Sequence, residues 1–188
     1  MKLFGEENET VATGQENLAV ILEKFNELEK SKELKLKALA TKKKLLGEGS
    51  PQVAMSLSNL GVLYEALNDL QGAEELYKQS VAIRRRALGE DHPELAMGYN
   101  NYGGLLVRLG KPKEGAEQLE NAVRIFKISN GPDTFETGNA YWWLSTAYES
   151  AGNVKKANEA GKEAYRAFKI ALGEDDSRTQ MLKEKYAK

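Results

Sequence analysis

His92 is the only imidazole available for acid–base or metal chemistry in this chain of 188 residues. Nucleophilic catalysis needs a serine, cysteine or lysine beside a base, and a zinc site needs several histidines or cysteines. The chain has no cysteine and no second histidine, and no serine recurs as a partner of His92. Gly103 and Gly104 lie inside a helical pattern, so they form no phosphate-binding loop. We therefore expect no enzyme, no metal and no cofactor.

The charge balance argues against nucleic acid and membrane partners. The chain carries 27 basic and 28 acidic residues, spread evenly, for a net charge of −1. A nucleic-acid-binding domain concentrates positive charge on one surface, and a membrane span needs about 18 consecutive apolar residues. The sequence has neither feature, nor an apolar signal segment at its start. We expect a cytoplasmic protein, although an organellar protein that has lost its transit peptide would look the same.

An internal repeat of 42 residues organises the whole chain. Gly47-Glu48, Gly89-Glu90 and Gly173-Glu174 are separated by multiples of this period, and Gly131 occupies the remaining place. Such a period is typical of repeat proteins in which each unit stacks on its neighbours. We predict one array over residues 1–188, with a degenerate repeat at 5–46, clear repeats at 47–88, 89–130 and 131–172, and one capping helix in 173–188.

Each repeat is predicted to form two helices. Asp91 precedes Pro93 and Glu94 in the pattern of an N-cap with a capping box, Asp133 repeats it, and Ser50 takes the same place before Pro51. A residue in the left-handed conformation commonly ends a helix. The predicted breaks within the repeats fall at Asn68, Gly110 and Gly152.

Two sets of equivalent positions predict how the helices pack. One set is small in every repeat, which indicates that two helix backbones approach closely there, and we expect Gly103 to lie at such a contact. The neighbouring set is large and apolar, as a core requires. The small residues are Ala19, Gly61, Gly103 and Ser145, and the large ones are Leu18, Leu60, Tyr102 and Leu144.

Three segments resemble the tetratricopeptide repeat in the 42-residue form found in kinesin light chains. They are G-E-D-H-P at 89–93, N-L-G-x-L-Y at 59–64 and A-E-x-L-Y-x-x-S-V-x-I-R at 73–84. The resemblance is strong over residues 47–172 and weaker over 5–46, where Lys35 replaces an aromatic residue. It implies an all-α, right-handed solenoid of helical hairpins, with about four repeats and a C-terminal capping helix that covers the surface around Tyr148 and Tyr165.

The resemblance also implies a concave groove lined by the first helix of each repeat. There, asparagines would bond a ligand backbone, methionines would contact apolar side chains, and Arg108 would pair with an acid. Alternatively, the asparagines satisfy a neighbouring helix and the methionines fill packing gaps. The candidate groove residues are Met55, Asn59, Val62, Met97, Asn101, Gly104, Arg108, Asn139, Trp142, Trp143 and Thr146.

The adjacent tryptophans Trp142 and Trp143 point about 100° apart on a helix, so they do not share one pocket. We expect one to pack and the other to be exposed in the groove or covered by a partner, which suits a residue common at binding hot spots. Alternatively, both fill space near the C-terminal cap.

A basic ladder follows the ends of the second helices, at Arg85, Lys127 and Lys169. These cations could meet an acidic partner. They are also what a helix C-terminus favours electrostatically, so a purely structural role stays open.

These features predict a non-enzymatic adaptor that holds a peptide or helix of another protein in its groove. The lysines of the two-carboxylate clamp used by chaperone-tail binders of this family are missing, with Glu16 and Ser58 among the residues in their place. We expect an acidic segment with an apolar anchor, bound across repeats 47–88 and 89–130. The alternative is a structural or assembly subunit that docks through an end or the convex face, and self-association through the ends stays open.

Overall fold

The computed structural model describes residues 8–187, which form nine α-helices and no strand. They divide into two compact units, unit 1 up to residue 89 and unit 2 from residue 90 onward. The helices of unit 1 are α1 Glu9–Lys24, α2 Leu28–Leu46, α3 Pro51–Ala66 and α4 Leu70–Leu88. Those of unit 2 are α5 Pro93–Arg108, α6 Pro112–Ser129, α7 Phe135–Ser150, α8 Val154–Leu172 and α9 Ser177–Tyr186. This is the all-α repeat fold that the period predicts.

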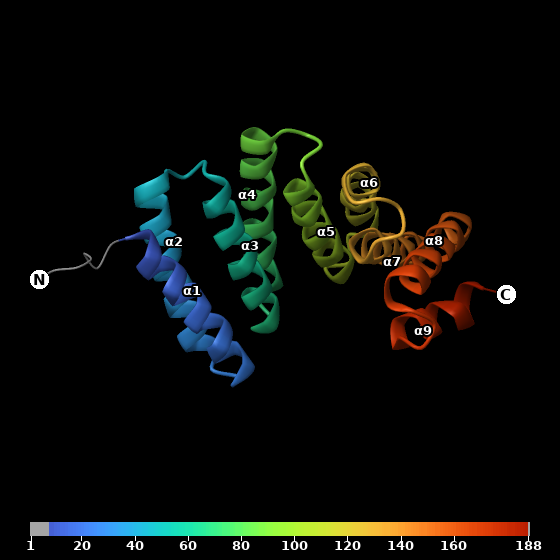
Figure 1. The fold of residues 1–188 in the computed structure, drawn as a ribbon, viewed down its shortest axis with the longest axis horizontal. Coiled ribbons are helices and arrows are strands. Elements are labelled where there is room, and N and C mark those ends of the chain that lie inside the picture. Colours follow the sequence, from blue (N-terminus) through green and yellow to red (C-terminus); the bar gives the residue numbers. More distant parts are fainter. Residues whose placement is uncertain (1–7, 188) are drawn as a thin grey trace, which may run out of the picture. The chain divides into compact units, whose positions relative to one another are not determined.

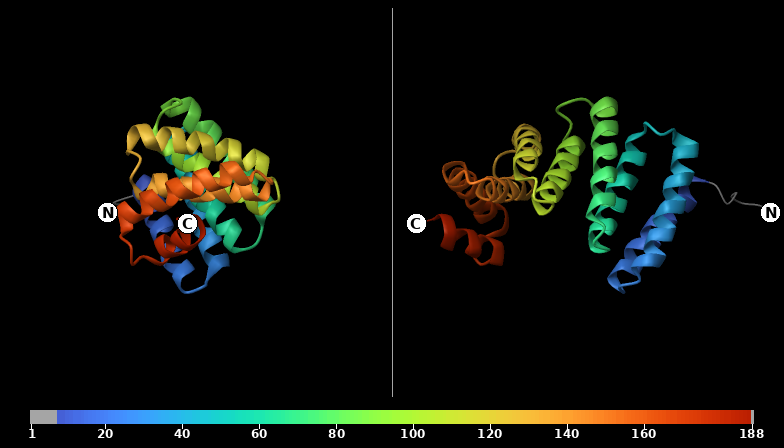
Figure 2. Two further views of the ribbon diagram at one scale, coloured as in Figure 1. Left: turned by 90° about the vertical axis from the view of Figure 1, so that its right-hand side faces the viewer. Right: turned by 180° about the vertical axis from the view of Figure 1, so that it is seen from behind.

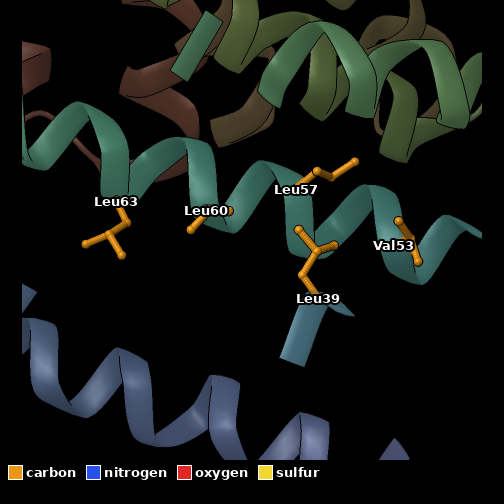
Figure 3. Packing of buried hydrophobic residues seen from close by; sticks show 5 residues of the cluster. All are labelled: Leu39, Val53, Leu57, Leu60 and Leu63. Carbon is orange, nitrogen blue, oxygen red and sulfur yellow. The ribbon is translucent and has the colours of Figure 1, made fainter. Parts of the chain in front are cut away.

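In unit 1 each helix packs on the next one along the chain, so that α2 lies against both α1 and α3 (Figures 1 and 2). The core between α2 and α3 is aliphatic. Leu39 projects from α2 toward α3, which carries Leu57, Leu60 and Leu63 (Figure 3). All four side chains are buried. Leu60, one of the large apolar positions of the repeat, therefore lies in the core as predicted.

In unit 2 the same sequential packing runs from α5 to α9, and α9 lies against α8 (Figure 1). Phe168 and Ala164 of α8 form a buried cluster with Leu182 and Tyr186 of α9. The ring of Tyr186 lies over Gly161, where a Cβ atom would come within 2.5 Å of it. The last helix therefore seals the apolar face of α8.

The breaks between helices occur where the sequence predicts them. Asn68, Gly110 and Gly152 have φ angles of 61°, 75° and 78°, in the left-handed region. Asn26, one period before Asn68, has a φ of 60° and ends α1 in the same way. The segment that the sequence marks as degenerate therefore forms a hairpin of the same kind as the others.

The prediction of aspartate N-caps before α5 and α7 is wrong. The caps are His92, whose Nδ1 accepts from the backbone N–H of Glu94 at 3.2 Å, and Thr134. Asp91 and Asp133 instead pair with Arg124 and Arg166, each 33 residues later on the second helix of the same hairpin. Because the helices begin at Pro93 and Phe135, the aspartates lie one residue before the capping position. Ser50 caps α3 as expected, accepting from the N–H of Val53 at 3.2 Å.

The close helix contact predicted at Gly103 is present between α5 and α6. A Cβ atom on Gly103 would lie 2.6 Å from Cγ of Leu119 and 3.0 Å from the carbonyl oxygen of Gly115. Distances below 3.0 Å leave no room for a side chain without movement of the neighbour. The small residues of this set therefore let the two backbones approach.

Two predicted packing positions differ from the structure. Leu18, expected in the core with Leu60, is 49% exposed because no helix covers that side of α1 among the described residues. The cap helix covers Tyr165 but not Tyr148. Tyr148 instead donates its hydroxyl hydrogen to Glu120 on α6, and burial together with this bond raises the pKa of the phenol.

Lys35, which replaces an aromatic residue of the repeat pattern, is buried between helices. Its side chain is 5% exposed, and Nζ lies 2.6 Å from Glu23 of α1 and 3.0 Å from the carbonyl oxygen of Asn59 on α3. A buried ammonium needs a counter-ion and hydrogen-bond acceptors, and Lys35 has both. Lys35 on α2 therefore contacts both α1 and α3, at a position where the repeat pattern has an aromatic ring.

Candidate functional site

In unit 1, the α3 face consists of Met55, Asn59 and Val62, which lie on one exposed side of the helix. Met55 is 42% exposed, so it does not fill a packing gap. Asn59 uses its backbone carbonyl to accept from Lys35, but no hydrogen bond within residues 8–187 engages its side-chain amide. The amide therefore does not satisfy a neighbouring helix, and it can meet the backbone of a ligand.

The α3 face continues onto α1, which sequence reasoning missed. Asn17 and Val20 lie one period before Asn59 and Val62, and both are exposed. The hydroxyl of Ser56 donates to Glu16, so the neighbouring turns of α1 and α3 lie beside each other. The 42-residue spacing of Asn17 and Asn59 was the signal that could have identified them.

In unit 2, the α5 face consists of Met97, Asn101 and Arg108. Met97 is 51% exposed and Arg108 is exposed, while Asn101 is half-buried. The side-chain amide of Asn101, like that of Asn59, makes no hydrogen bond within the described part of the chain. Asn59 and Asn101, which are 42 residues apart, thus each present a side-chain amide beside an exposed methionine.

Asn139 has a structural partner. Its Oδ1 accepts a hydrogen bond of 3.1 Å from Nδ2 of Asn100, which joins α5 to α7. The role of satisfying a neighbouring helix, considered for Asn101, is therefore taken by the residue before it.

Both tryptophans are half-buried, and each packs against another helix of unit 2. Trp143 packs on Gly104 of α5, where a Cβ atom would lie 3.4 Å from the indole. Trp142 packs toward α8 and α9, on the cluster that contains Phe168. The two rings lie 5.8 Å apart between centroids. They bridge three layers of unit 2, which favours the space-filling alternative.

The cap helix α9 carries a candidate contact residue that sequence reasoning missed. Met181 lies two periods after Met97, and it is 43% exposed. The exposed methionine of the first helices therefore recurs on α9, and it was overlooked because that helix was treated only as a polar cap.

The residues of the basic ladder, Arg85, Lys127 and Lys169, are all exposed. Nζ of Lys169 lies 2.6 Å from Glu174. This contact raises the pKa of Lys169 and lowers that of Glu174. Arg84, in the same basic run as Arg85, is buried and donates to Ser58 at 3.1 Å.

An apolar pocket lies beside Lys127 in unit 2. Val123 and Ile128 of α6 and Leu144 of α7 line it together with Lys127, Arg124 and Glu120, and its volume is about 400 Å³. Arg124 is paired with Asp91. A large apolar side chain fits this pocket.

The described residues contain no group of three or more His, Asp or Glu side chains that could hold a metal ion. No helix among residues 8–187 is long and apolar enough to cross a membrane. The exposed amides, thioethers and cations lie on paired helices, and this arrangement defines a helical repeat protein.

Two family models, both described as "Tetratricopeptide repeat", match the sequence. One matches residues 11–52 and again residues 53–94, and the other matches residues 94–170. The matches cover most of the chain, so this protein belongs to the tetratricopeptide repeat family. No curated protein matches the sequence.

Solved structures share the fold. The crystal structure of BtubC (BKLC) from P. vanneervenii superposes with a TM-score of 0.79 at 22% identity, over 88% of this chain and 66% of that one. This chain thus spans just under two thirds of BtubC. Two crystal structures of the Podosopora anserina putative kinesin light chain nearly identical TPR-like repeats are also similar.

The first Podosopora structure has a TM-score of 0.84 at 22% identity, over 98% of this chain and 86% of that one. The second has a TM-score of 0.74 at 23% identity, over 89% and 80%. At these identities the likeness shows the kinesin-light-chain-like repeat fold. Proteins of this family are in general protein–protein interaction scaffolds, and the fold is typically a non-enzymatic module.

Proposed function

We propose that this protein is a non-enzymatic adaptor whose α3 face and α5 face each bind an extended segment of a partner protein. The observation that carries the proposal is the pair of unbonded side-chain amides of Asn59 and Asn101, each beside an exposed methionine. Amides recognise the backbone of any extended peptide, and flexible thioethers adapt to varied apolar side chains.

The energetics limit what the amides contribute. Two neutral hydrogen bonds supply about 1–3 kcal/mol together, whereas micromolar binding needs about 8 kcal/mol. Apolar anchors must supply most of the remainder, through Met55, Val62 and Met97. Because Arg108 and Lys127 add positive charge in unit 2, the preferred segment carries one or two acids and one large apolar residue.

Selection from a displayed library of random peptides tests this proposal. Enriched peptides should combine an acid with a large apolar side chain, and Asn59→Ala or Asn101→Ala should weaken a selected peptide about 3–10-fold. Asn158→Ala, an exposed asparagine on α8, serves as the matched control and should leave affinity unchanged. Unchanged affinity in both Asn59→Ala and Asn101→Ala would remove the basis of the proposal.

Charge reversal tests the preference for acids. Arg108→Glu should weaken the peptide more than Arg85→Ala does, and raising the salt concentration should weaken binding modestly, because exposed ion pairs contribute at most about 1 kcal/mol each. Selection of basic or purely apolar peptides would contradict this preference.

A second candidate function is a subunit of a larger assembly that docks through an end of the array. The exposed apolar side chains on α1, which begin with Leu18, favour it. This function does not depend on the α3 and α5 faces.

A further inference from the structure

The α6–α8 crevice is a depression between the two second helices of unit 2, with Leu144 of α7 at its base. Two pockets meet at the side chain of Leu144. The pocket on the α6 side has a volume of about 400 Å³, and Val123, Lys127 and Ile128 lie in its wall. The pocket on the α8 side has a volume of about 420 Å³, and Ala160 lies in its wall. Much of the crevice is therefore lined by apolar side chains.

In unit 1 a leucine side chain takes the equivalent place. Leu60 of α3 lies two periods before Leu144, and Leu76 of α4 lies two periods before Ala160. The side chain of Leu76 packs on the buried cluster that contains Leu60. Alanine has only a methyl group, so in unit 2 the space that a leucine would take beside Leu144 stays open. The two units thus share a position for an aliphatic side chain, and only unit 1 fills it from its own sequence.

The crevice does not lie where another hairpin of the array would stack. Within the described residues α5 already packs on α6, and α9 already packs on α8. Both walls of the crevice therefore have their neighbouring helix in place. A further hairpin would stack beyond α5 or α9, and it would leave the crevice uncovered.

The α6 wall of the crevice offers one positive charge. Lys127 is exposed, and it makes no ion pair within residues 8–187. The other two charged side chains of this wall are already engaged, because Arg124 pairs with Asp91 and Glu120 pairs with Lys156. The ammonium group of Lys127 is therefore complementary to an acidic side chain.

The α8 wall carries charges of both signs. Glu159 and Lys162 line it, both are exposed, and neither makes an ion pair in the part of the chain that the structure describes. Glu163 also lines this wall, and its Oε2 lies 3.6 Å from Nη1 of Arg166. One unpaired acid and one unpaired base give this wall no preference for either sign. The charge that the crevice selects is therefore an acid on the side of α6.

The lining of the crevice suits a helix better than an extended peptide. The backbone N–H and C=O groups of an extended peptide need hydrogen-bond partners when they leave water. Among the described residues no asparagine or glutamine lines either pocket, in contrast to the α3 and α5 faces with Asn59 and Asn101. A helix satisfies its backbone groups internally, and it can place an apolar row in a groove between other helices.

The open part of the crevice is about two helical turns long. Oε1 of Glu120 on α6 and Nζ of Lys156 on α8 lie 3.5 Å apart, and this ion pair closes the crevice beside Tyr148. Ile128, farther along α6, is 69% exposed. The segment from Glu120 to Ile128 rises about 12 Å. A helix of this length presents two apolar residues, three or four positions apart, on one face.

We propose that the α6–α8 crevice binds an amphipathic helix of a partner protein. One large aliphatic side chain of that helix enters the space beside Ala160 and takes the place that Leu76 has in unit 1. A second apolar side chain covers Ile128, and an acid on the flank that faces α6 pairs with Lys127. This site goes beyond the proposed function, because it depends on neither the α3 face nor the α5 face.

A displayed library of amphipathic helical peptides supplies the probe. Selection uses the full chain with Asn59→Ala and Asn101→Ala, so that binding through the α3 and α5 faces is weakened. Enriched helices should carry leucine or another large aliphatic residue with an acid on one flank. Affinity of a fluorescein-labelled selected helix is then measured by fluorescence anisotropy on the parent chain, where it should equal the affinity for the double variant.

Two variants of the crevice test where the helix binds. Ala160→Leu should weaken binding about tenfold or more, because its side chain fills the space that the partner needs, and its thermal midpoint should equal or exceed that of the parent. Ile128→Glu should weaken binding to a similar extent without affecting the fold, since this side chain is 69% exposed. Ile170→Glu is the matched control, one period later on α8, 60% exposed and outside both pockets, and it should leave affinity unchanged.

Charge reversal tests the pairing with Lys127. Lys127→Glu should weaken a selected helix about 3–5-fold, as expected for an exposed ion pair. Replacing the acid of the peptide by lysine should restore affinity for the Lys127→Glu chain. Lys155→Glu, an exposed position of α8 outside both pockets, should have no effect.

Three results would overturn the proposal. The first is a selection that yields no helical binder, or only binders that Ala160→Leu and Ile128→Glu do not weaken. The second is a dimer in sedimentation that Ile128→Glu dissociates, which would make a second copy of this chain the occupant. The third is a selected helix that binds only after residues 1–7 are removed, which would make that segment the occupant.

Discussion

Units 1 and 2 place different chemistry at the same positions of the repeat. In unit 1 a first-helix residue and a second-helix residue 26 positions later form a buried polar pair, first Glu16 with Lys42 and then Ser58 with Arg84. Lys42 is 3% exposed and its Nζ lies 2.6 Å from Glu16 and 3.2 Å from Ser56. Unit 1 therefore joins its layers partly through charge.

In unit 2 three of the four equivalent positions are aromatic, and the fourth is Asn100, which donates a hydrogen bond to Asn139. Phe126 and Phe168 replace Lys42 and Arg84, and both are buried. Trp142 takes the place of Glu16 and Ser58, and it packs on the cluster that contains Phe168. The ring of Phe168 also stacks on Phe135 at 5.6 Å.

The difference shows that the repeat period fixes where helices meet but not what holds them together. A buried ion pair compensates desolvation only while both partners remain, whereas an aromatic cluster loses area gradually. Unit 1 should therefore be the more sensitive to single polar substitutions, and unit 2 to truncation of its rings.

The largest effect is expected from Glu16→Ala. Removing this carboxylate leaves the ammonium of Lys42 buried without a counter-ion, which costs about 3–5 kcal/mol. Urea unfolding followed by circular dichroism measures this loss. Glu9→Ala, in the exposed first turn of α1, is the control and should cost less than about 1 kcal/mol. Equal losses of stability in Glu16→Ala and Glu9→Ala would show that the Glu16–Lys42 ion pair contributes no more than an exposed charge.

Converting unit 1 to the chemistry of unit 2 sharpens the comparison. In the triple variant Glu16→Leu, Lys42→Met and Ser56→Ala, all members of the polar group become apolar together, so no buried charge is left unpaired. The free energy of unfolding should stay the same or rise by about 1–4 kcal/mol. A large loss of stability in urea unfolding would mean that unit 1 requires charge at this position.

A smaller effect on stability is expected from substitutions of two glycines inside helices, one in each unit. Gly103→Leu places a side chain where a Cβ atom already meets Leu119 and the carbonyl of Gly115, and overpacking of this kind costs about 1–3 kcal/mol. Gly14→Ala, with open space around its Cβ, should instead stabilise by about 0.5–1 kcal/mol. Thermal midpoints that do not move in opposite directions would refute the packing argument.

Much of the fold, but less of the site, could be predicted from the sequence. The glycines and asparagines of the turns act locally, so their spacing predicted the breaks. The partners of Lys35 and Lys42 come from other helices, and a lysine on a helix gives no local sign of burial. Asp91 looked like a cap because the D-x-P-E pattern does not show that α5 begins at Pro93 with His92 as its N-cap. The asparagine that bonds to a neighbouring helix is Asn100, not Asn101. Which of two adjacent residues faces that helix depends on the rotation of α5 about its axis, and the repeat period alone does not determine this rotation.

The smallest effect concerns pH and the attachment of α9 in unit 2. Hydrogen bonds from Arg178 and Lys169 lower the pKa values of Asp176 and Glu174. Because these values are lowered in the folded state, the contacts stabilise α9 above the ordinary carboxylate range, about pH 4, and are lost as the pH falls through the lowered values. Fluorescence of Trp142 should change in that acidic range. Asp176→Asn should abolish part of this change, and an identical titration would contradict the assignment.

The central claim is that the exposed first-helix faces bind the partner, and methionine methyl groups report on it directly. The chain has four methionines, of which Met55, Met97 and Met181 are described and exposed on first helices. In a chain labelled with ¹³C at the methionine methyl groups, titration with a library-selected peptide should shift the signal of Met55, Met97 or both. Asn59→Ala and Asn101→Ala should reduce those shifts at equal peptide concentration. A peptide that binds while the signals of Met55 and Met97 stay in place would contradict the account.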